Sequence, residues 1–206
     1  ISTLLNTGNG TFSAQVCTIV GYRPRSLEVS DFNGDGIKDV AVGDNVGTIS
    51  ILLGNGNGTF HAGVCYQAGG PAWSVKSGDL NGDGFQDLAV ANYTSNTISV
   101  LLGNGDGSFK SQMCFNGGDR VASVAIVDFN LDGYLDLVSG NMQSNNVSVL
   151  TGNGDGSFQA QTCYQAGAGA ASIRTGDFNG DGMSDIAVLD TSATSASILI
   201  NRGDGT

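Results

Sequence analysis

The strongest constraint on this chain is an internal repeat with a period of 48 or 49 residues. The nine-residue segment DFNGDGIKD at 31–39 recurs in closely similar form at 79–87, 128–136 and 177–185. The cysteines keep the same spacing, at Cys17, Cys65, Cys114 and Cys163. Because two unrelated markers share one register, each period should correspond to one structural unit, so the repeat has to be interpreted before any single motif.

Each period divides into four short apolar runs that are separated by turn residues. In the first complete period these runs cover 26–32, 40–43 and 49–53, and the fourth extends from Phe60 through the cysteine. The segment GNGNGTF at 54–60, between the third and fourth runs, is typical of a hairpin turn, where Gly and Asn supply the positive φ that the turn requires. Four strands per period predict a blade of antiparallel sheet.

Composition supports an all-β fold. The 206 residues include 33 Gly, 2 Pro and a single Glu, while 40% of the chain is hydrophobic, which is too apolar for disorder and too glycine-rich for helices. We therefore expect an all-β β-propeller, or a propeller-like arc, of four-stranded blades, with about four repeats of 48–49 residues. The expected organisation is one repeat domain, 1–206, with a partial blade at 1–21, repeats at about 22–69, 70–118 and 119–167, and a final partial repeat at 168–206.

Charge excludes some partner classes. The chain has 19 acidic and 8 basic residues and a formal net charge of −11. Since no basic surface is available to neutralise phosphates, we expect no nucleic-acid partner. No apolar run approaches the roughly 18 residues that a bilayer-spanning helix needs, so no membrane span is predicted.

The Asp-rich loop has the residue types of a hard-cation site. Oxygen-bearing side chains occupy loop positions one, three, five and nine, and alternate positions of a tight loop point to a common centre. Gly36 permits the sharp reversal, and the backbone carbonyl at position seven supplies a further oxygen. The predicted ligands are Asp31, Asn33, Asp35, Ile37, Asp39, Asp79, Asn81, Asp83, Phe85, Asp87, Asp128, Asn130, Asp132, Tyr134, Asp136, Asp177, Asn179, Asp181, Met183 and Asp185.

These donors favour Ca²⁺, at about four ions, one per loop. Hard oxygens at flexible spacing suit calcium better than magnesium, and without a thiolate or imidazole near the loop zinc and copper are poor candidates. The alternative is a set of Asx turns that cap backbone amides without metal. It leaves unexplained why three carboxylates, which repel one another, recur in all four loops. The third loop has Leu131 at position four, where the others have Gly, but that position is not a predicted ligand.

The segments DFNGDGIKD, DLNGDGFQD, DFNLDGYLD and DFNGDGMSD, with LAVAN and ISVLLGNGDGSF after the second loop, resemble FG-GAP/VCBS repeats. Such repeats occur in integrin α-subunit heads and in many secreted proteins. The resemblance covers essentially the whole chain. It implies a β-propeller of four-stranded blades, calcium in the loop between the first two strands of each blade, and an extracellular, secreted or cell-surface location. The family's propellers usually have seven blades, whereas this chain has material for just over four.

No catalytic constellation is evident in the sequence, and we expect no enzyme. The single histidine, His61, lies in a variable stretch that carries Ser13, Lys110 and Gln159 in the other repeats. The cysteines are packed thiols, disulfide partners or sites of intermolecular cross-linking. Four sequons, which we expect in exposed hairpin turns, make the chain a candidate glycoprotein; their acceptors are Asn9, Asn57, Asn92 and Asn146.

We expect an extracellular, calcium-stabilised repeat protein with a structural, adhesive or assembly role, either alone or as a segment of a longer array or filament. The alternatives are a carbohydrate-binding lectin-type propeller and a non-catalytic accessory module of a larger secreted protein. Residues 1–5 align with the third run of later repeats, so the sequence begins with a third and fourth strand and ends with a first, second and third. The predicted partners are therefore other repeats or copies of the chain, joined through terminal strands, with glycans or extracellular proteins as further candidates.

Overall fold

The computed structural model describes residues 1–203, and these residues form seventeen β-strands and no helix. The described part of the chain thus contains no helical segment that could cross a bilayer. Three complete four-stranded sheets follow one another along the chain, and each sheet is an antiparallel meander. The first sheet contains β3 (Pro24–Ser30), β4 (Asp39–Asp44), β5 (Thr48–Leu52) and β6 (Val64–Gln67).

The next two sheets repeat this order. The second sheet contains β7 (Ala72–Gly78), β8 (Asp87–Asn92), β9 (Thr97–Leu101) and β10 (Met113–Asn116). The third contains β11 (Val121–Val127), β12 (Asp136–Asn141), β13 (Asn146–Leu150) and β14 (Thr162–Gln165). We call these three sheets blades one, two and three.

Smaller sheets lie at both ends of the described chain. The amino-terminal one pairs β1 (Ser2–Thr3) with β2 (Val16–Cys17). Blade four contains β15 (Ala170–Gly176), β16 (Asp185–Asp190) and β17 (Ser195–Leu199).

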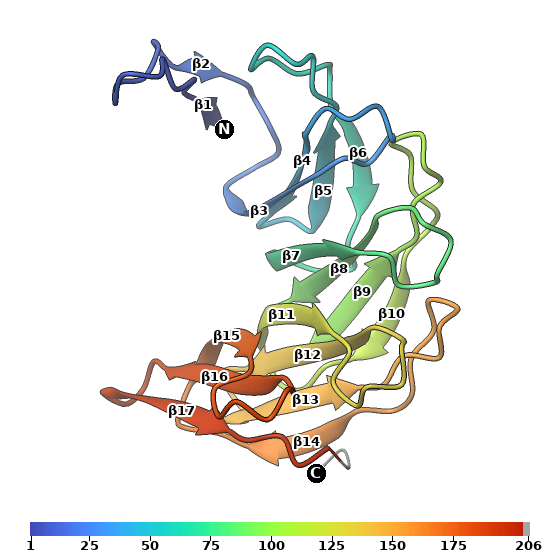
Figure 1. The fold of residues 1–206 in the computed structure, drawn as a ribbon, viewed down its shortest axis with the longest axis vertical. Coiled ribbons are helices and arrows are strands. Elements are labelled where there is room, and N and C mark those ends of the chain that lie inside the picture. Colours follow the sequence, from blue (N-terminus) through green and yellow to red (C-terminus); the bar gives the residue numbers. More distant parts are fainter. Residues whose placement is uncertain (204–206) are drawn as a thin grey trace.

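The blades are arranged around an arc that is not closed into a ring (Figure 1). The first strands of neighbouring blades, β3, β7, β11 and β15, contact one another in turn on the concave side. The fourth strands, β6, β10 and β14, lie toward the convex side. The predicted all-β, propeller-like arc of four-stranded blades is therefore confirmed.

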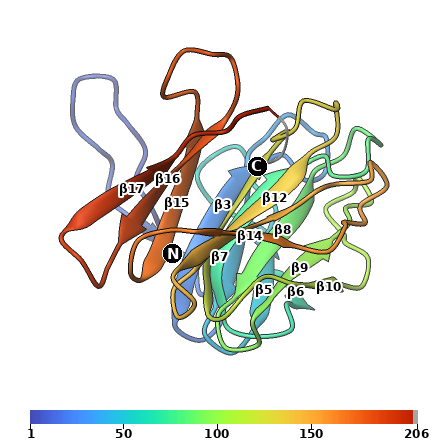
Figure 2. The same cartoon turned by 90° about the horizontal axis from the view of Figure 1, so that it is seen from below.

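The antiparallel meander gives every blade two distinct edges. The loops between first and second strands, and those between third and fourth strands, emerge together on one edge, which we call the Asp-loop edge (Figure 2). The loops between second and third strands, and the connections from one blade to the next, emerge on the other, which we call the second edge. The repeat therefore places all four Asp-rich loops on the same side of the molecule.

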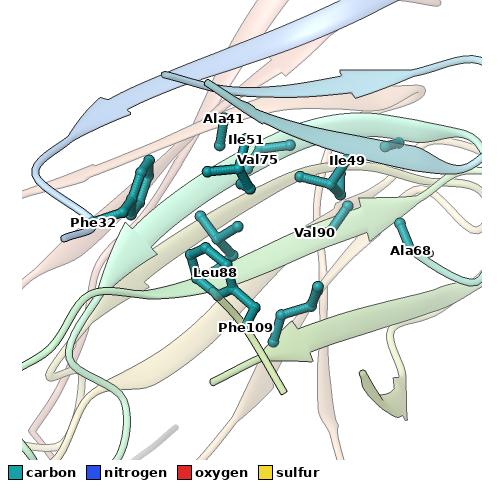
Figure 3. Packing of buried hydrophobic residues seen from close by; sticks show 11 residues of the cluster. Phe32, Ala41, Ile49, Ile51, Ala68, Val75, Leu88, Val90 and Phe109 are labelled. Carbon is teal, nitrogen blue, oxygen red and sulfur yellow. The ribbon is translucent and has the colours of Figure 1, made fainter. Parts of the chain in front are cut away.

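The hydrophobic core lies between adjacent blades. Every residue of β4, β8 and β12 is buried, because these second strands lie inside their own sheets and are covered by neighbouring sheets on their faces. Figure 3 shows the layer between blades one and two, where Ile49 and Ile51 of one sheet face Val75, Leu88 and Val90 of the next. Two further clusters of the same kind fill the spaces between blades two and three and between blades three and four.

Candidate metal centre in the Asp-rich loops

Each Asp-rich loop joins the first strand of its blade to the second and folds as a series of Asx turns. In blade one, Asp31 accepts two backbone hydrogen bonds, from the amide of Gly34 to Oδ1 at 2.7 Å and from the amide of Gly36 to Oδ2 at 2.8 Å. Gly34 and Gly36 have φ values of 73° and 82°, in the left-handed region that glycine enters without a steric penalty. The loop therefore reverses sharply around the carboxylate at its first position.

The side chains at positions three and five are hydrogen-bonded to each other. Nδ2 of Asn33 donates to Oδ2 of Asp35 at 2.9 Å, and the backbone amide of Asp35 donates to Oδ1 of Asn33 at 3.1 Å. The other three loops repeat both bonds. In the second loop the amide of Asp83 also lies 3.1 Å from Oδ1 of Asp79. The oxygens of positions one and three thus converge on position five.

The aspartate at position nine is fully buried and has a different environment. In blade two, Oδ2 of Asp87 accepts from the amide of Leu80 at 2.8 Å and Oδ1 accepts from the amide of Gly103 at 2.7 Å. The other three blades repeat this arrangement, with Asp39, Asp136 and Asp185 as acceptors. This carboxylate therefore ties the Asp-rich loop to the end of the third strand.

Burial dominates the electrostatics of this carboxylate. It raises the pKa of Asp87 to about 6; the backbone hydrogen bonds from Gly103 and Leu80 oppose the shift, and the charges of Asp83 and Asp79 add to it. The pKa of Asp136 is raised by burial in the same way. A raised pKa means that the fold disfavours the ionised carboxylate, so a positive charge nearby would stabilise it.

At position one of the first and fourth loops, hydrogen bonding outweighs burial, and the pKa of the carboxylate is lowered. The backbone hydrogen bond from Gly36 is the largest cause that lowers the pKa of Asp31, and the bond from Gly182 lowers that of Asp177 in the same manner. These carboxylates are therefore held in the ionised form by the loop itself.

The donor set fits a hard cation in its chemistry. Positions one, three and five present carboxylate and amide oxygens from one turn, and no thiolate or imidazole belongs to the loop. In residues 1–203, however, no three acidic, His or Cys side chains are gathered closely enough to hold a metal by themselves. Position three is an amide and position nine faces backbone amides, so the structure contains the hydrogen bonds of the Asx-turn alternative. The ligand assignment of positions one to nine stays a prediction.

The third loop accommodates a non-glycine residue in a left-handed conformation. Leu131 has a φ of 60°, close to the 73° of Gly34 and the 74° of Gly82 at the equivalent positions. A β-carbon in this region costs roughly 1–2 kcal/mol, and the exposed Leu131 side chain gains little packing in return. The loop conformation is thus imposed by the eight other positions and does not depend on glycine at position four.

The four sequons lie in different environments. Asn9 and Asn57 are exposed in hairpin turns, as expected, whereas Asn146 is half-buried at the start of β13. The expectation that Asn92 lies in an exposed turn is wrong. Asn92 ends β8 with no exposed surface, and its Nδ2 donates to Ser99 Oγ at 2.7 Å, so a glycan on that nitrogen would require local unfolding.

The cysteines are unpaired and exposed in this structure. They recur on the outer strand of successive sheets, each with its Sγ 3.4–3.6 Å from a serine Oγ of the neighbouring third strand; the pairs are Ser2–Cys17, Ser50–Cys65, Ser99–Cys114 and Ser148–Cys163. Because the amino-terminal sheet and blades one to three each contribute one cysteine at the equivalent position, the four thiols lie on separate sheets.

Four-stranded antiparallel blades stacked around an arc, with a hydrogen-bonded aspartate loop after each first strand, define a β-propeller-type repeat protein. The FG-GAP-like repeat pattern matches three overlapping segments, residues 31–90, 79–139 and 128–188. The chain therefore belongs to the FG-GAP-like repeat family. No curated protein matches the sequence significantly.

Solved structures share the fold at low sequence identity. A lectin of Agrocybe aegerita, studied for its specific recognition of non-reducing terminal N-acetylglucosamine, is 21% identical with a TM-score of 0.65. The match covers 100% of this chain and 58% of the lectin. BBS1N, solved in complex with ARL6DN, is 13% identical with a TM-score of 0.60, over 93% of this chain and 56% of BBS1N. This chain thus spans somewhat more than half the length of either structure, and these likenesses concern the fold alone.

Proposed function

We propose that this chain is an extracellular, calcium-stabilised repeat module with a structural, adhesive or assembly role and no catalytic activity. One observation carries the proposal, namely that the same turn of converging oxygen donors occurs four times on one edge of the arc. An enzyme needs one distinctive site, whereas these loops are interchangeable. Membership in the FG-GAP-like repeat family and the propeller-like fold support a module that is built by repetition.

In each loop the proposed ligands of the ion are the carboxylates at positions one, five and nine, the amide oxygen at position three and the carbonyl at position seven. The carboxylate at position nine is buried and also accepts two backbone hydrogen bonds. Calcium would supply a divalent charge that offsets the repulsion among three carboxylates. Sites of extracellular modules bind calcium at about 10⁻⁴–10⁻³ M, so the ion would act as a constant structural component rather than as a signal.

Chelation is expected to lower the melting temperature markedly. An ion that binds only the folded state adds RT ln(1 + [L]/Kd), which is about 2.7 kcal/mol per site at a hundredfold excess over Kd. Calorimetry with calcium and with excess chelator measures the difference. Asp83→Ala should reduce the calcium response, while Asp106→Ala, which removes an exposed acid from a hairpin turn outside the Asp-rich loops, should leave it intact. Identical melting curves with and without chelator would refute the metal proposal.

The partners proposed for the module are other repeats or copies of the chain. Between blades one and two, the ring of Phe109 packs edge-on against Phe32 and Tyr66, at centroid distances of 5.6 Å each. At the equivalent place between blades three and four, a cavity of about 290 Å³ is lined by Phe129 and Tyr164, beside β17. The chemistry of the cavity suits an aromatic ring from the hairpin of another repeat.

Association through this cavity is expected to depend on an exposed hairpin phenylalanine. The amino-terminal hairpin carries Phe12, 62% exposed, in the same bridge position as Phe109 of blade two. Sedimentation velocity over a range of concentrations should show self-association that Phe12→Ser weakens. His61→Ser, an exposed change outside the hairpin turn, is the control. A concentration-independent monomer would contradict assembly through copies of this chain.

Carbohydrate binding is the second candidate function, because one cavity between blades one and two combines aromatic and polar side chains. This cavity of about 450 Å³ is lined by Tyr66, Gln67, Lys110 and Gln112, among others. Oε1 of Gln112 is buried without a hydrogen-bond partner in the described residues, so it is an acceptor that no protein donor satisfies. The fold is shared with a lectin. Binding on a glycan array that Gln112→Ala abolishes would support this function.

A further inference from the structure

Four side chains from three blades form one continuous stack on the second edge, opposite the Asp-rich loops. The rings of Trp73 and Tyr93 are parallel, with centroids 3.8 Å apart and an interplanar angle of 6°. The guanidinium carbon of Arg25 lies 4.8 Å from the Trp73 ring centre, and that of Arg120 lies 5.7 Å from the Tyr93 ring centre. We call the four residues the Arg–aromatic stack. Nearby, the guanidinium of Arg23 lies 5.2 Å from the Tyr22 ring centre.

The large side chains of the Arg–aromatic stack do not recur at the equivalent positions of all blades. Arg25 and Trp73 occupy the β-bulges of β3 and β7, where an extra residue is left unpaired and its side chain is redirected. The equivalent bulge residues of blades three and four are Ala122 and Ala171. The fold thus requires the bulge but not a large side chain in it, so core packing does not explain Arg25 and Trp73.

The backbone is strained at Arg120, one of the two arginines of the stack, but not at Arg25. Arg120 has a φ of 57° and Arg23, at the equivalent position of blade one, has a φ of 53°. In blade four this position is Gly169, with a φ of 77°, which carries no steric penalty. Non-glycine residues in this region cost of order 1–3 kcal/mol and are concentrated at functional sites. Of the stack residues, Arg120 therefore occupies its position at a conformational cost.

The guanidinium groups are not neutralised by the protein. Within residues 1–203 the only ion pair joins Lys76 to Glu28, so neither Arg25 nor Arg120 has an acidic partner. Nε of Arg25 donates to Oδ1 of Asn45 at 3.1 Å, which leaves the terminal nitrogens of this exposed arginine to face solvent. Unpaired arginines are notable in a chain with a net charge of −11, whose acids are concentrated in loops on the other edge.

We propose that the Arg–aromatic stack is a docking site for an extended acidic peptide. A guanidinium that lies over an aromatic ring in a cation–π contact still presents the forked donors that bind a carboxylate with two hydrogen bonds. Spacings of 4.8, 3.8 and 5.7 Å allow the two guanidinium carbons to be separated by no more than about 14 Å. Carboxylates four residues apart on one side of an extended strand are separated by roughly 13 Å, which lies within this limit.

Sugar stacking at this place is disfavoured by the same geometry. One face of Trp73 is covered by Tyr93 and the other by Arg25, so neither face is open to a pyranose ring. The recognition groups that remain are the edges of the guanidinium groups, and their chemistry selects carboxylates. This site is independent of the proposed calcium loops and lies on the opposite edge.

The site contains its own reporter, because Trp73 is the only tryptophan of the chain. The full chain is titrated at low salt with a short synthetic peptide that carries glutamates four residues apart, and Trp73 fluorescence is recorded. A peptide of the same composition with adjacent glutamates, and a uronate oligomer of equal charge, are the comparison probes. We expect saturable binding of the spaced peptide that weakens with added salt, and weaker binding of both comparison probes.

Arg25→Ala and Arg120→Ala should each weaken binding of the spaced peptide by about tenfold, while Arg174→Ala, at an exposed basic residue outside the stack, should not. Melting temperatures of all three variants identify any loss that comes from unfolding. The proposal is overturned if the spaced peptide does not bind, if the control variant loses as much affinity as the stack variants, or if the uronate oligomer binds more tightly in an arginine-dependent manner.

Discussion

Asp87→Ala is expected to lower the free energy of unfolding by about 3 kcal/mol when the measurement is made in excess chelator. The substitution removes the acceptor for the amides of Leu80 and Gly103, which are buried and have no other route to water. An unsatisfied buried amide costs about 1–3 kcal/mol. Relief of the buried charge, which the raised pKa of Asp87 reflects, offsets part of that loss. Urea unfolding at constant pH measures the change.

The chelator separates two roles for this aspartate. If Asp87 acts only as a metal ligand, the variant and the parent should be equally stable without metal; if it ties the loop to the third strand, the loss should persist. Asp83→Ala is the matched control, since it removes an exposed carboxylate of the same loop and should change stability by less than about 1 kcal/mol in chelator. Equal stability of Asp87→Ala and the parent in chelator would contradict the structural role.

The fold could be predicted from the sequence because the same pattern occurs four times. The apolar runs at 26–32, 40–43 and 49–53 correspond to β3, β4 and β5 within two residues at each end. Where the apolar pattern of one repeat leaves a strand assignment ambiguous, the equivalent segments of the other repeats identify the strand. The fourth strand begins later than its apolar run, since Phe60 makes only an isolated bridge with Gly54 before β6 starts at Val64.

The candidate sites could be predicted from the sequence only in part. The spacing of loop donors identifies carboxylates, but only the three-dimensional register shows that Asp87 faces the amide of Gly103, sixteen residues away. The burial of Asn92 was missed for the same reason, because a sequon does not reveal that its asparagine ends an internal strand. The Arg–aromatic stack did leave a signal. Arg25 and Trp73 stand where later repeats have Ala122 and Ala171, but the contact between them depends on the packing of two blades.

Gly152→Ala is expected to be the most damaging single methyl addition in the hairpins, with a loss of about 3 kcal/mol or more. A β-carbon on Gly152 would lie 2.2 Å from the backbone oxygen of Leu135, and backbone cannot move aside as a flexible side chain can. Any shift also strains the bond from the Gly152 amide to Asp136 and the bridge to Phe158. Overpacking costs typically 1–3 kcal/mol, and a broken buried bond adds about 1 kcal/mol or more. Thermal unfolding measures the sum.

Gly176→Ala is the control, because a β-carbon there would meet only the Phe178 ring, at 3.6 Å. It should leave stability unchanged or raise it by up to about 1 kcal/mol, since alanine restricts the unfolded chain. Asn201 stands at the position of Gly152, yet its side chain is accommodated and donates to the oxygens of Phe129 and Ser184. In blade three the bridge to Phe158 holds the backbone against Leu135, so Gly152→Ala should release that hairpin and expose Phe158 to solvent. Equal stability of Gly152→Ala and Gly176→Ala would contradict the prediction, because it would show that the hairpin accommodates the added β-carbon without loss of stability.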